Sequence, residues 1–305
     1  MTLVIETERL TKVYSGGNKA VDDLTLAVEP GEIFGYLGPN GAGKTTTIHL
    51  LLDVIRPTRG GASLFGLDVR RDRTAIHARI GFLPAELNLW KNLTAREVID
   101  HFARLRGGVD KAWFRTLTER LQFDASRRIR SYSTGNKRKL GLVLAMMHQP
   151  ELLILDEPSS GLDPLMQQTF NQLMLETKSE GRTVFLSSHV LGEVQAICDR
   201  VGILNAGQLQ MVSRVDALTH AAFRWVTVRV RGPVSALHLA GIPGVDDVTV
   251  ADDVVRLRLT GDFDPLLQAL NSTYVEDIDI QRPTLEEIFL TYYTPSGPAL
   301  PEVRL

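Results

Sequence analysis

The sequence has little of several features that would each point to a class of protein. A single cysteine, Cys198, excludes an internal disulfide bond and fits a reducing compartment. No run approaches the ~20 apolar residues that span a bilayer, so a membrane role would require a partner. The net charge of −2 excludes a general electrostatic attraction to nucleic acid or anionic lipid. The opening stretch MTLVIETERL carries charges and no apolar core, so we expect no secretion signal.

The composition is that of an ordinary globular protein, with 44% hydrophobic and 23% charged residues. At 305 residues, the chain is long enough for one large or two unequal domains. Its first two thirds alternate short apolar strands with amphipathic helices, such as 45–54 and 191–198, which predicts an α/β fold with a mostly parallel sheet. The strands expected there are Leu3–Arg9, Leu24–Val28, Ile33–Leu37, Ile80–Leu83, Leu152–Asp156 and Thr183–Ser187.

Helical spacing replaces the strand pattern between Ala85 and Pro150, so we expect a mostly helical insert at roughly 85–150. Its helices are predicted at Thr94–Arg106, Lys111–Leu121 and Lys137–His148. We therefore predict one domain over residues 1–220 that contains this insert.

The pattern changes after Ala221, where residues 223–231 (FRWVTVRVR) alternate strictly and predict a half-buried strand. The order that follows is helix, two strands, helix and strand, which resembles a ferredoxin-like split unit. We predict a small α+β accessory domain over 221–294 and a flexible tail over 295–305. The elements after the first strand are expected at Val234–Ala240, Val245–Val250, Val254–Leu259, Pro265–Asn271, Tyr274–Ile280 and Thr284–Tyr293.

A glycine-rich segment follows the strand 33–37 and matches the Walker A pattern, Gly38-x-x-x-x-Gly43-Lys44-Thr45, in the strand–loop–helix context that this pattern requires. Backbone N–H groups and the helix N-terminus can surround a β-phosphate. The Lys44 ammonium suits the β/γ oxygens, and the Thr45 hydroxyl suits Mg²⁺. The residues predicted to bind the nucleotide here are Gly38, Pro39, Asn40, Gly41, Ala42, Gly43, Lys44, Thr45 and Thr46.

The apolar strand 152–156 ends in two carboxylates, Asp156 and Glu157, and follows the glycine-rich loop in the order expected of a Walker B motif. Asp156 would hold Mg²⁺ through water, and Glu157 would polarise the attacking water. The histidines show no metal-ligand spacing, so we expect no metal beyond nucleotide-bound Mg²⁺.

A third segment, YSTGN at Tyr132–Asn136, lies shortly before the Walker B strand and resembles the signature of the ATP-binding-cassette (ABC) ATPases. Residues 160–163 (SGLD) resemble the D-loop of that family, with Asp163 as its acidic residue. His189, after FLSS, resembles its switch histidine, and Tyr14 resembles the aromatic that stacks on adenine. The resemblance extends from about residue 3 to residue 211.

This resemblance implies a P-loop ABC ATPase core that binds ATP and Mg²⁺ and works as a head-to-tail homodimer. Ser133, Gly135 and Asn136 would then cover the γ-phosphate held by the other copy. Lys44, Glu157 and His189 would carry the hydrolysis, with His189 hydrogen-bonded to the γ-phosphate.

The chain departs from the family pattern at two places. Thr134 replaces a glycine of the signature, and Asn136 replaces a glutamine. In IGFLPAELNLW, Ala85 stands where the family usually has the Q-loop glutamine. Glu86 is one hypothetical substitute, and altered coupling or slower hydrolysis is the alternative.

The segment TLEEIFL at 284–290 is similar to one that closes ATPase subunits of bacterial drug, antibiotic and polysaccharide exporters. We therefore expect a peripheral subunit at the cytoplasmic face of the membrane, working with a separate polytopic permease. The exported compound would be a drug, an antibiotic, another hydrophobic compound or a polysaccharide.

Other functions stay open at this point. A non-transport ABC ATPase on ribosomes or DNA is disfavoured by the single cassette, and an importer ATPase by the closing segment. An ATP-gated dimer switch with little turnover stays open because of Ala85. We interpret the basic residues 127–130 and 137–139 as a solvated face rather than a nucleic-acid site. The apolar cluster of Leu87, Leu89 and Trp90 fits either local packing or a groove for a helix of the permease.

Overall fold

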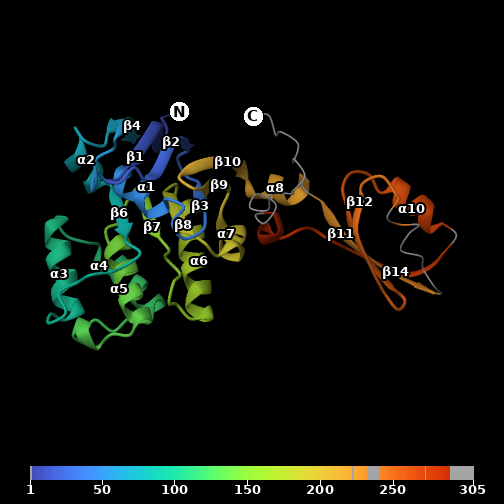
Figure 1. The fold of residues 1–305 in the computed structure, drawn as a ribbon. Coiled ribbons are helices and arrows are strands. Elements are labelled where there is room, and N and C mark those ends of the chain that lie inside the picture. The colour runs from blue at the N-terminus through green and yellow to red at the C-terminus, as the bar shows by residue number, and fades with distance from the viewer. Residues whose placement is uncertain (1, 222, 232–238, 240, 272, 289–305) are drawn as a thin grey trace. The chain divides into compact units, whose positions relative to one another are not determined.

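The computed structural model describes residues 2–221, 223–231, 239, 241–271 and 273–288 (Figure 1). It divides into two compact units, Met1–Ser213 and Arg214–Leu305. The division lies shortly before the boundary that the sequence places at residue 220. None of the helices in the described part combines the length and the apolar character needed to cross a membrane.

The first unit is built on a six-stranded sheet with a parallel centre. Its strand order is β10-β9-β3-β8-β7-β6, and β9, β3, β8, β7 and β6 pair in parallel. Strands β3 and β7 are buried at every position, as expected of parallel strands covered on both faces. Parallel pairing brings the carboxyl ends of β3, β7 and β8 to one edge. The strands are β3 (Ile33–Leu37), β6 (Ile80–Leu83), β7 (Leu152–Asp156), β8 (Thr183–Ser188), β9 (Arg200–Asn205) and β10 (Gln208–Arg214).

A separate antiparallel sheet contains the first two strands of the chain, in the order β2-β1-β4-β5. The sequence had placed 3–9 and 24–28 in the mostly parallel sheet, and this part of the prediction is wrong. The physical reason is visible in their alternating burial, which is typical of an antiparallel sheet with one face in the core. The strands are β1 (Ile5–Val13), β2 (Lys19–Val28), β4 (Arg59–Leu64) and β5 (Leu67–Asp68).

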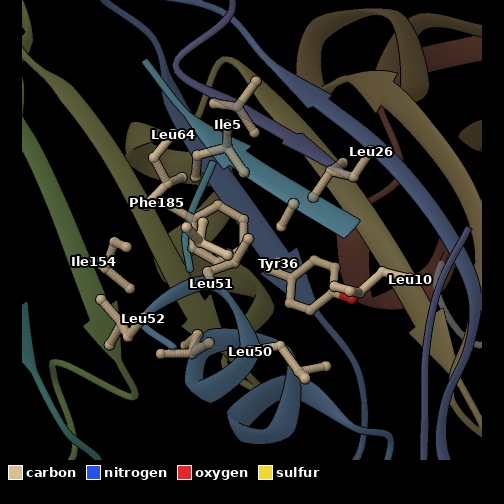
Figure 2. Close-up of a cluster of buried hydrophobic side chains, with 14 of the residues drawn as sticks. Ile5, Leu10, Leu26, Tyr36, Leu50, Leu51, Leu52, Leu64, Ile154 and Phe185 are labelled. Atoms are coloured by element: carbon tan, nitrogen blue, oxygen red, sulfur yellow. The ribbon is translucent and has the colours of Figure 1, made fainter. Parts of the chain in front are cut away.

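The core of this unit joins both sheets to the helix that follows the glycine-rich loop, α1 (Lys44–Leu51). The ring of Phe185 stacks on Phe34 with centroids 5.8 Å apart and tilts against Tyr36. This packing fixes α1, and with it the preceding loop, against the parallel sheet. Figure 2 shows side chains of α1, β3, β7 and β8 meeting those of the antiparallel sheet, among them Ile5, Leu26, Tyr36, Leu50, Leu51, Leu64, Ile154 and Phe185.

Three helices form the predicted insert and gather on one side of the unit (Figure 1). Between 85 and 150, the described residues contain no strand beyond one isolated bridge, Thr94↔Arg128. The helix α5 begins at Thr134, before the predicted Lys137, because Ser133 caps it by accepting a hydrogen bond from the Asn136 amide (3.3 Å). The elements are α3 (Ala95–Leu105), α4 (Lys111–Arg120), the 3₁₀ turn Ile129–Ser131 and α5 (Thr134–Met146). The other helices of the unit are α2 (Arg73–Ala78), α6 (Pro164–Ser179) and α7 (Leu191–Ile197).

The second unit carries an antiparallel sheet in the order β12-β13-β11-β14. This is the strand order of a ferredoxin-like split unit, so the predicted fold class is confirmed. The predicted helix 234–240 lies outside the described residues except for residue 239, and the predicted tail 295–305 lies wholly outside them. The predicted helix 284–293 is described to residue 288 and is helical over 285–288. The elements are α8 (Val215–Ala221), β11 (Arg224–Arg231), β12 (Val245–Ala251), β13 (Val254–Leu259), α10 (Asp264–Leu270) and β14 (Tyr274–Gln281).

Candidate functional site

The loop between β3 and α1 can be built only with glycine at two of its positions. Gly43 has φ 109°, and a Cβ there would lie 2.2 Å from the Ala20 carbonyl oxygen. A Cβ on Gly38 would lie 2.5 Å from the Leu204 carbonyl oxygen. Both approaches are far inside van der Waals contact. The glycines therefore let the loop pass close to the backbone while it leads into the N-terminus of α1.

Lys44, the first residue of α1, points back over this loop. Its side chain is only 6% exposed, and its Nζ donates to the Gly38 carbonyl at 2.6 Å. The same ammonium lies 3.3 Å from Oε1 of Glu157. A buried cation held between a loop and a carboxylate is pre-positioned to meet an anionic ligand.

Thr45 and Asp156 meet at the carboxyl edge of the parallel sheet. The Thr45 hydroxyl donates to Asp156 Oδ2 at 2.8 Å, and the Ser187 hydroxyl donates to Asp156 Oδ1 at 2.5 Å. Asp156 is 1% exposed, so its two oxygens are directed by these hydroxyls. A hydroxyl beside a carboxylate is an oxygen donor set that fits Mg²⁺ completed by phosphate and water.

Glu157 adopts a left-handed backbone conformation, with φ 50°. Its amide donates to the Ser187 hydroxyl at 3.1 Å, and its Oε2 lies 2.6 Å from Nδ1 of His189. The structure thus brings Lys44, Glu157 and His189 together from α1, the end of β7 and the end of β8. Non-glycine residues with positive φ are uncommon and concentrate at functional sites.

Lys44, Thr45 and Glu157 line a cavity of about 540 Å³ within the first unit, whereas Asp156 and His189 lie behind them and are not among its lining residues. Tyr14, which is 41% exposed, forms one wall, and Ala85 forms another. Glu86 is exposed and does not line the cavity, so the hypothesis that it substitutes for the Q-loop glutamine gains no support. The lining residues are Tyr14, Asn18, Lys19, Ala20, Pro39, Asn40, Gly41, Gly43, Lys44, Thr45, Thr46, Ala85, Glu157 and Ala206.

The signature residues do not line this cavity. Ser133, Gly135 and Asn136 lie at the N-terminus of α5, with Ser133 exposed. Asp163 caps α6, because its carboxylate accepts a hydrogen bond from the Met166 amide at 3.0 Å. Within one copy of the chain, the signature residues therefore do not line the cavity that Lys44 and Glu157 line.

The chain is similar to known proteins over most of its length. A family model described as ABC transporter matches residues 21–160, and one described as ATP-binding protein DrrA1-3-like, C-terminal domain, matches 220–293. The bacitracin transport ATP-binding protein BcrA of Enterococcus faecalis is 34% identical over 281 residues, which cover 91% of this chain and 90% of that protein. The chain belongs to the ABC transporter family.

Two further comparisons agree. BcrA of Bacillus licheniformis is 41% identical over 212 residues, which cover 68% of this chain and 69% of that protein. A solved ATP-binding subunit of an ABC transporter superposes with a TM-score of 0.66 at 28% identity, covering 71% of this chain and 92% of that one. The predictions of an ABC-transporter subunit, of ATPase activity and of ATP with Mg²⁺ as cofactors are confirmed.

Three polar residues beside the predicted site were not predicted from the sequence. Ser187 holds both Asp156 and the Glu157 amide, and its signal was the FLSS run before His189. Glu193 of α7 accepts a hydrogen bond from the Ser159 hydroxyl at 2.5 Å, and burial raises the pKa of its carboxyl. Arg138 of α5 is buried, and nothing in the local pattern distinguished it from its basic neighbours.

Proposed function

We propose that this chain is the ATP-hydrolysing subunit of an exporter and acts as a homodimer on a separate permease. The observation that carries the proposal is the cluster of Lys44, Glu157 and His189 beside Thr45 and Asp156. Lys44 supplies a cation for the phosphate oxygens. Thr45 and Asp156 supply oxygen ligands for Mg²⁺, and Glu157, paired with His189, supplies a carboxylate base.

In this reaction, Mg²⁺ would neutralise charge on the β- and γ-phosphates when bound between Thr45 and, through water, Asp156. Lys44 compensates phosphate charge, and the Glu157 carboxylate takes a proton from the attacking water. His189 holds that carboxylate through Nδ1. Tyr14 is partly exposed and lines the cavity, and its aromatic ring offers a face for adenine.

A second copy is proposed because the signature residues lie outside the cavity. Ser133, Gly135 and the N-terminus of α5 offer a hydroxyl, backbone amides and a favourable dipole to an anion. We infer that they close over the γ-phosphate held by the partner cassette. Hydrolysis would convert ATP to ADP and phosphate, and departure of the phosphate would remove the shared anion and so release the pair.

The permease would bind at a groove of about 720 Å³ beside α3. Of the apolar cluster expected here, Leu87 packs toward Gly141 of α5, whereas Trp90 is 53% exposed and lines the groove. An exposed indole rimmed by charged residues fits a transient protein interface. We propose that a cytoplasmic segment of the permease binds there and holds the chain at the membrane. The lining residues are Trp90, Lys91, Asn92, Leu93, Glu97, Asp100, His101 and Arg104.

For the exported compound we propose an antibiotic or a related hydrophobic compound, because both BcrA relatives are described as bacitracin transport proteins. A polysaccharide or another drug is the alternative within the same branch.

The test is affinity purification of the natively expressed chain from detergent-solubilised membranes, followed by an ATPase assay of what co-purifies. We expect a polytopic membrane protein that raises ATP turnover. The Lys44→Ala variant, which lacks the ammonium for phosphate, serves as the inactive control. Recovery of the chain with ribosomes or DNA would support the non-transport alternative. ATP binding and dimerisation without turnover would support the dimer switch.

A further inference from the structure

Arg138 is a buried cation whose partners are main-chain carbonyls. It lies early in α5 and is 8% exposed. Its Nη1 and Nη2 donate to the carbonyls of Pro84 and Ala85, each at 2.8 Å, and its Nε donates to the carbonyl of Ser160 at 3.3 Å. Burial lowers the pKa of Arg138, while the charges of Asp156 and Glu157 act in the opposite direction. A guanidinium in this position is costly unless its hydrogen bonds are well formed.

The three acceptors belong to two loops that border the nucleotide cavity. Pro84 and Ala85 follow β6, and Ala85 lines the cavity. Ser160 lies in the turn after Glu157, and its amide donates to the Glu157 carbonyl at 3.2 Å. One planar side chain therefore joins the Ala85 wall to the turn that carries the proposed base.

Glu157 needs such support because its backbone is strained. Its φ of 50° lies in the left-handed region, where a non-glycine residue persists only if its surroundings fix it. Ser187 holds the Glu157 amide on one side, and Ser160 holds the Glu157 carbonyl on the other. Arg138 in turn fixes Ser160.

A second contact joins α5 to the turn after Glu157. A Cβ on Gly135 of α5 would lie 2.8 Å from the Gly161 carbonyl oxygen, and a Cβ on Gly161 would lie 3.1 Å from Cγ2 of Thr134. The backbones of α5 and the turn thus approach as closely as glycine permits. The first turns of α5 and the turn after Glu157 therefore form one packed body.

We propose that Arg138 is a positioning residue that holds Glu157 and the Ala85 wall of the cavity in the geometry required for hydrolysis. It acts through Ser160, Pro84 and Ala85 and does not itself face the phosphates. The inference goes beyond the proposed transport function, since it concerns how the cassette holds its own catalytic base in position.

Arg106 offers a matched control. Its guanidinium also donates to three main-chain carbonyls, those of His77, Ala78 and Ile80, at 2.8, 3.3 and 3.2 Å. These acceptors lie at the opposite end of β6 from Ala85. The variants to compare are Arg138→Met, Arg138→Lys and Arg106→Met. Methionine keeps the length of the side chain and removes the donors.

We expect Arg138→Met to lower kcat by about tenfold or more while the Kd for ATP changes by less than about twofold, because positioning acts on the reacting geometry. Arg138→Lys keeps the charge but has a single donor atom, so we expect it to restore part of kcat. Arg106→Met should leave kcat unchanged. Equal kcat for wild type and Arg138→Met, or an equal loss with Arg106→Met, would overturn the proposal.

Hydrogen–deuterium exchange on the nucleotide-free chain gives a readout that needs no turnover. Arg138→Met should speed exchange of the amides of Ala85, Glu86 and Glu157 and of those in 159–162, whereas Arg106→Met should affect the segment 77–80. Unchanged exchange at 157–162 would contradict the positioning role. If Arg138→Met does not fold, kcat and hydrogen exchange are measured on Arg138→Lys instead. A kcat and exchange rates equal to those of the wild type in Arg138→Lys would then overturn the proposal. Absence of ATPase activity in the wild type would count against the proposed function, while the exchange measurement would still test Arg138.

Discussion

Nδ1 of His189 lies 2.6 Å from Oε2 of Glu157, and the other oxygen of that carboxylate lies 3.3 Å from Nζ of Lys44. The base of the proposed reaction is thus held between an imidazole and an ammonium group. This arrangement orients the carboxylate while leaving Lys44 in contact with the phosphate loop. It also ties the ends of β7 and β8 to the start of α1.

The first prediction concerns Glu157→Gln. The amide retains the size of the carboxylate but cannot accept the proton, so we expect turnover to fall by about 100-fold or more. ATP binding should persist, and ATP should trap a dimer on a sizing column. Wild-type chain with ATP should dimerise only transiently. A variant that stays monomeric in saturating ATP would contradict the head-to-tail arrangement.

The second prediction concerns the exposed indole in the groove beside α3. Trp90→Ala should reduce association with the permease without changing ATP binding, since Trp90 does not line the nucleotide cavity. We expect a loss of about tenfold or more in affinity, as for a buried aromatic anchor at an interface. Co-purification from membranes measures the effect. Val54→Ala, which removes another exposed apolar side chain of the same unit, is the control and should associate normally.

The sequence predicted the strands that lead into the proposed nucleotide site better than the contacts that hold the site together. Strands β3, β6 and β7 were predicted with the observed bounds, because short apolar runs with clear ends follow local rules. The place of residues 5–13 in a second sheet depends on pairing with β4, which no local pattern contains. The roles of Ser187 and Arg138 likewise arise from contacts between segments far apart in sequence.

The third prediction tests the departure at the Q-loop. Ala85 presents only a methyl group to the cavity wall. If the missing glutamine limits hydrolysis, Ala85→Gln should raise ATP turnover or its stimulation by the permease. ATPase assays with and without the permease measure this, and Ala85→Leu controls for the added bulk. An unchanged rate in Ala85→Gln would show that this cassette hydrolyses ATP without help from that position.

The last prediction concerns stability at acidic pH and a histidine away from the cavity. His148 forms a hydrogen bond between Nε2 and the Ile80 carbonyl (3.1 Å), and within the described residues its buried Nδ1 has no partner. Burial, reinforced by the charge of Arg106, lowers the pKa of His148 from 6.5 to about 4.

Proton linkage determines whether the free energy of unfolding rises or falls with pH. Below pH 6.5 His148 is protonated in the unfolded chain, whereas in the folded chain it is protonated only below about pH 4. The stability contributed by the neutral ring is therefore complete above pH 6.5 and is lost as the pH falls toward 4. His148→Gln keeps a donor for the Ile80 carbonyl and cannot titrate. Urea unfolding at several pH values should show a smaller loss of unfolding free energy for this variant than for wild type over that window. Equal slopes would show that His148 is not buried in its neutral form.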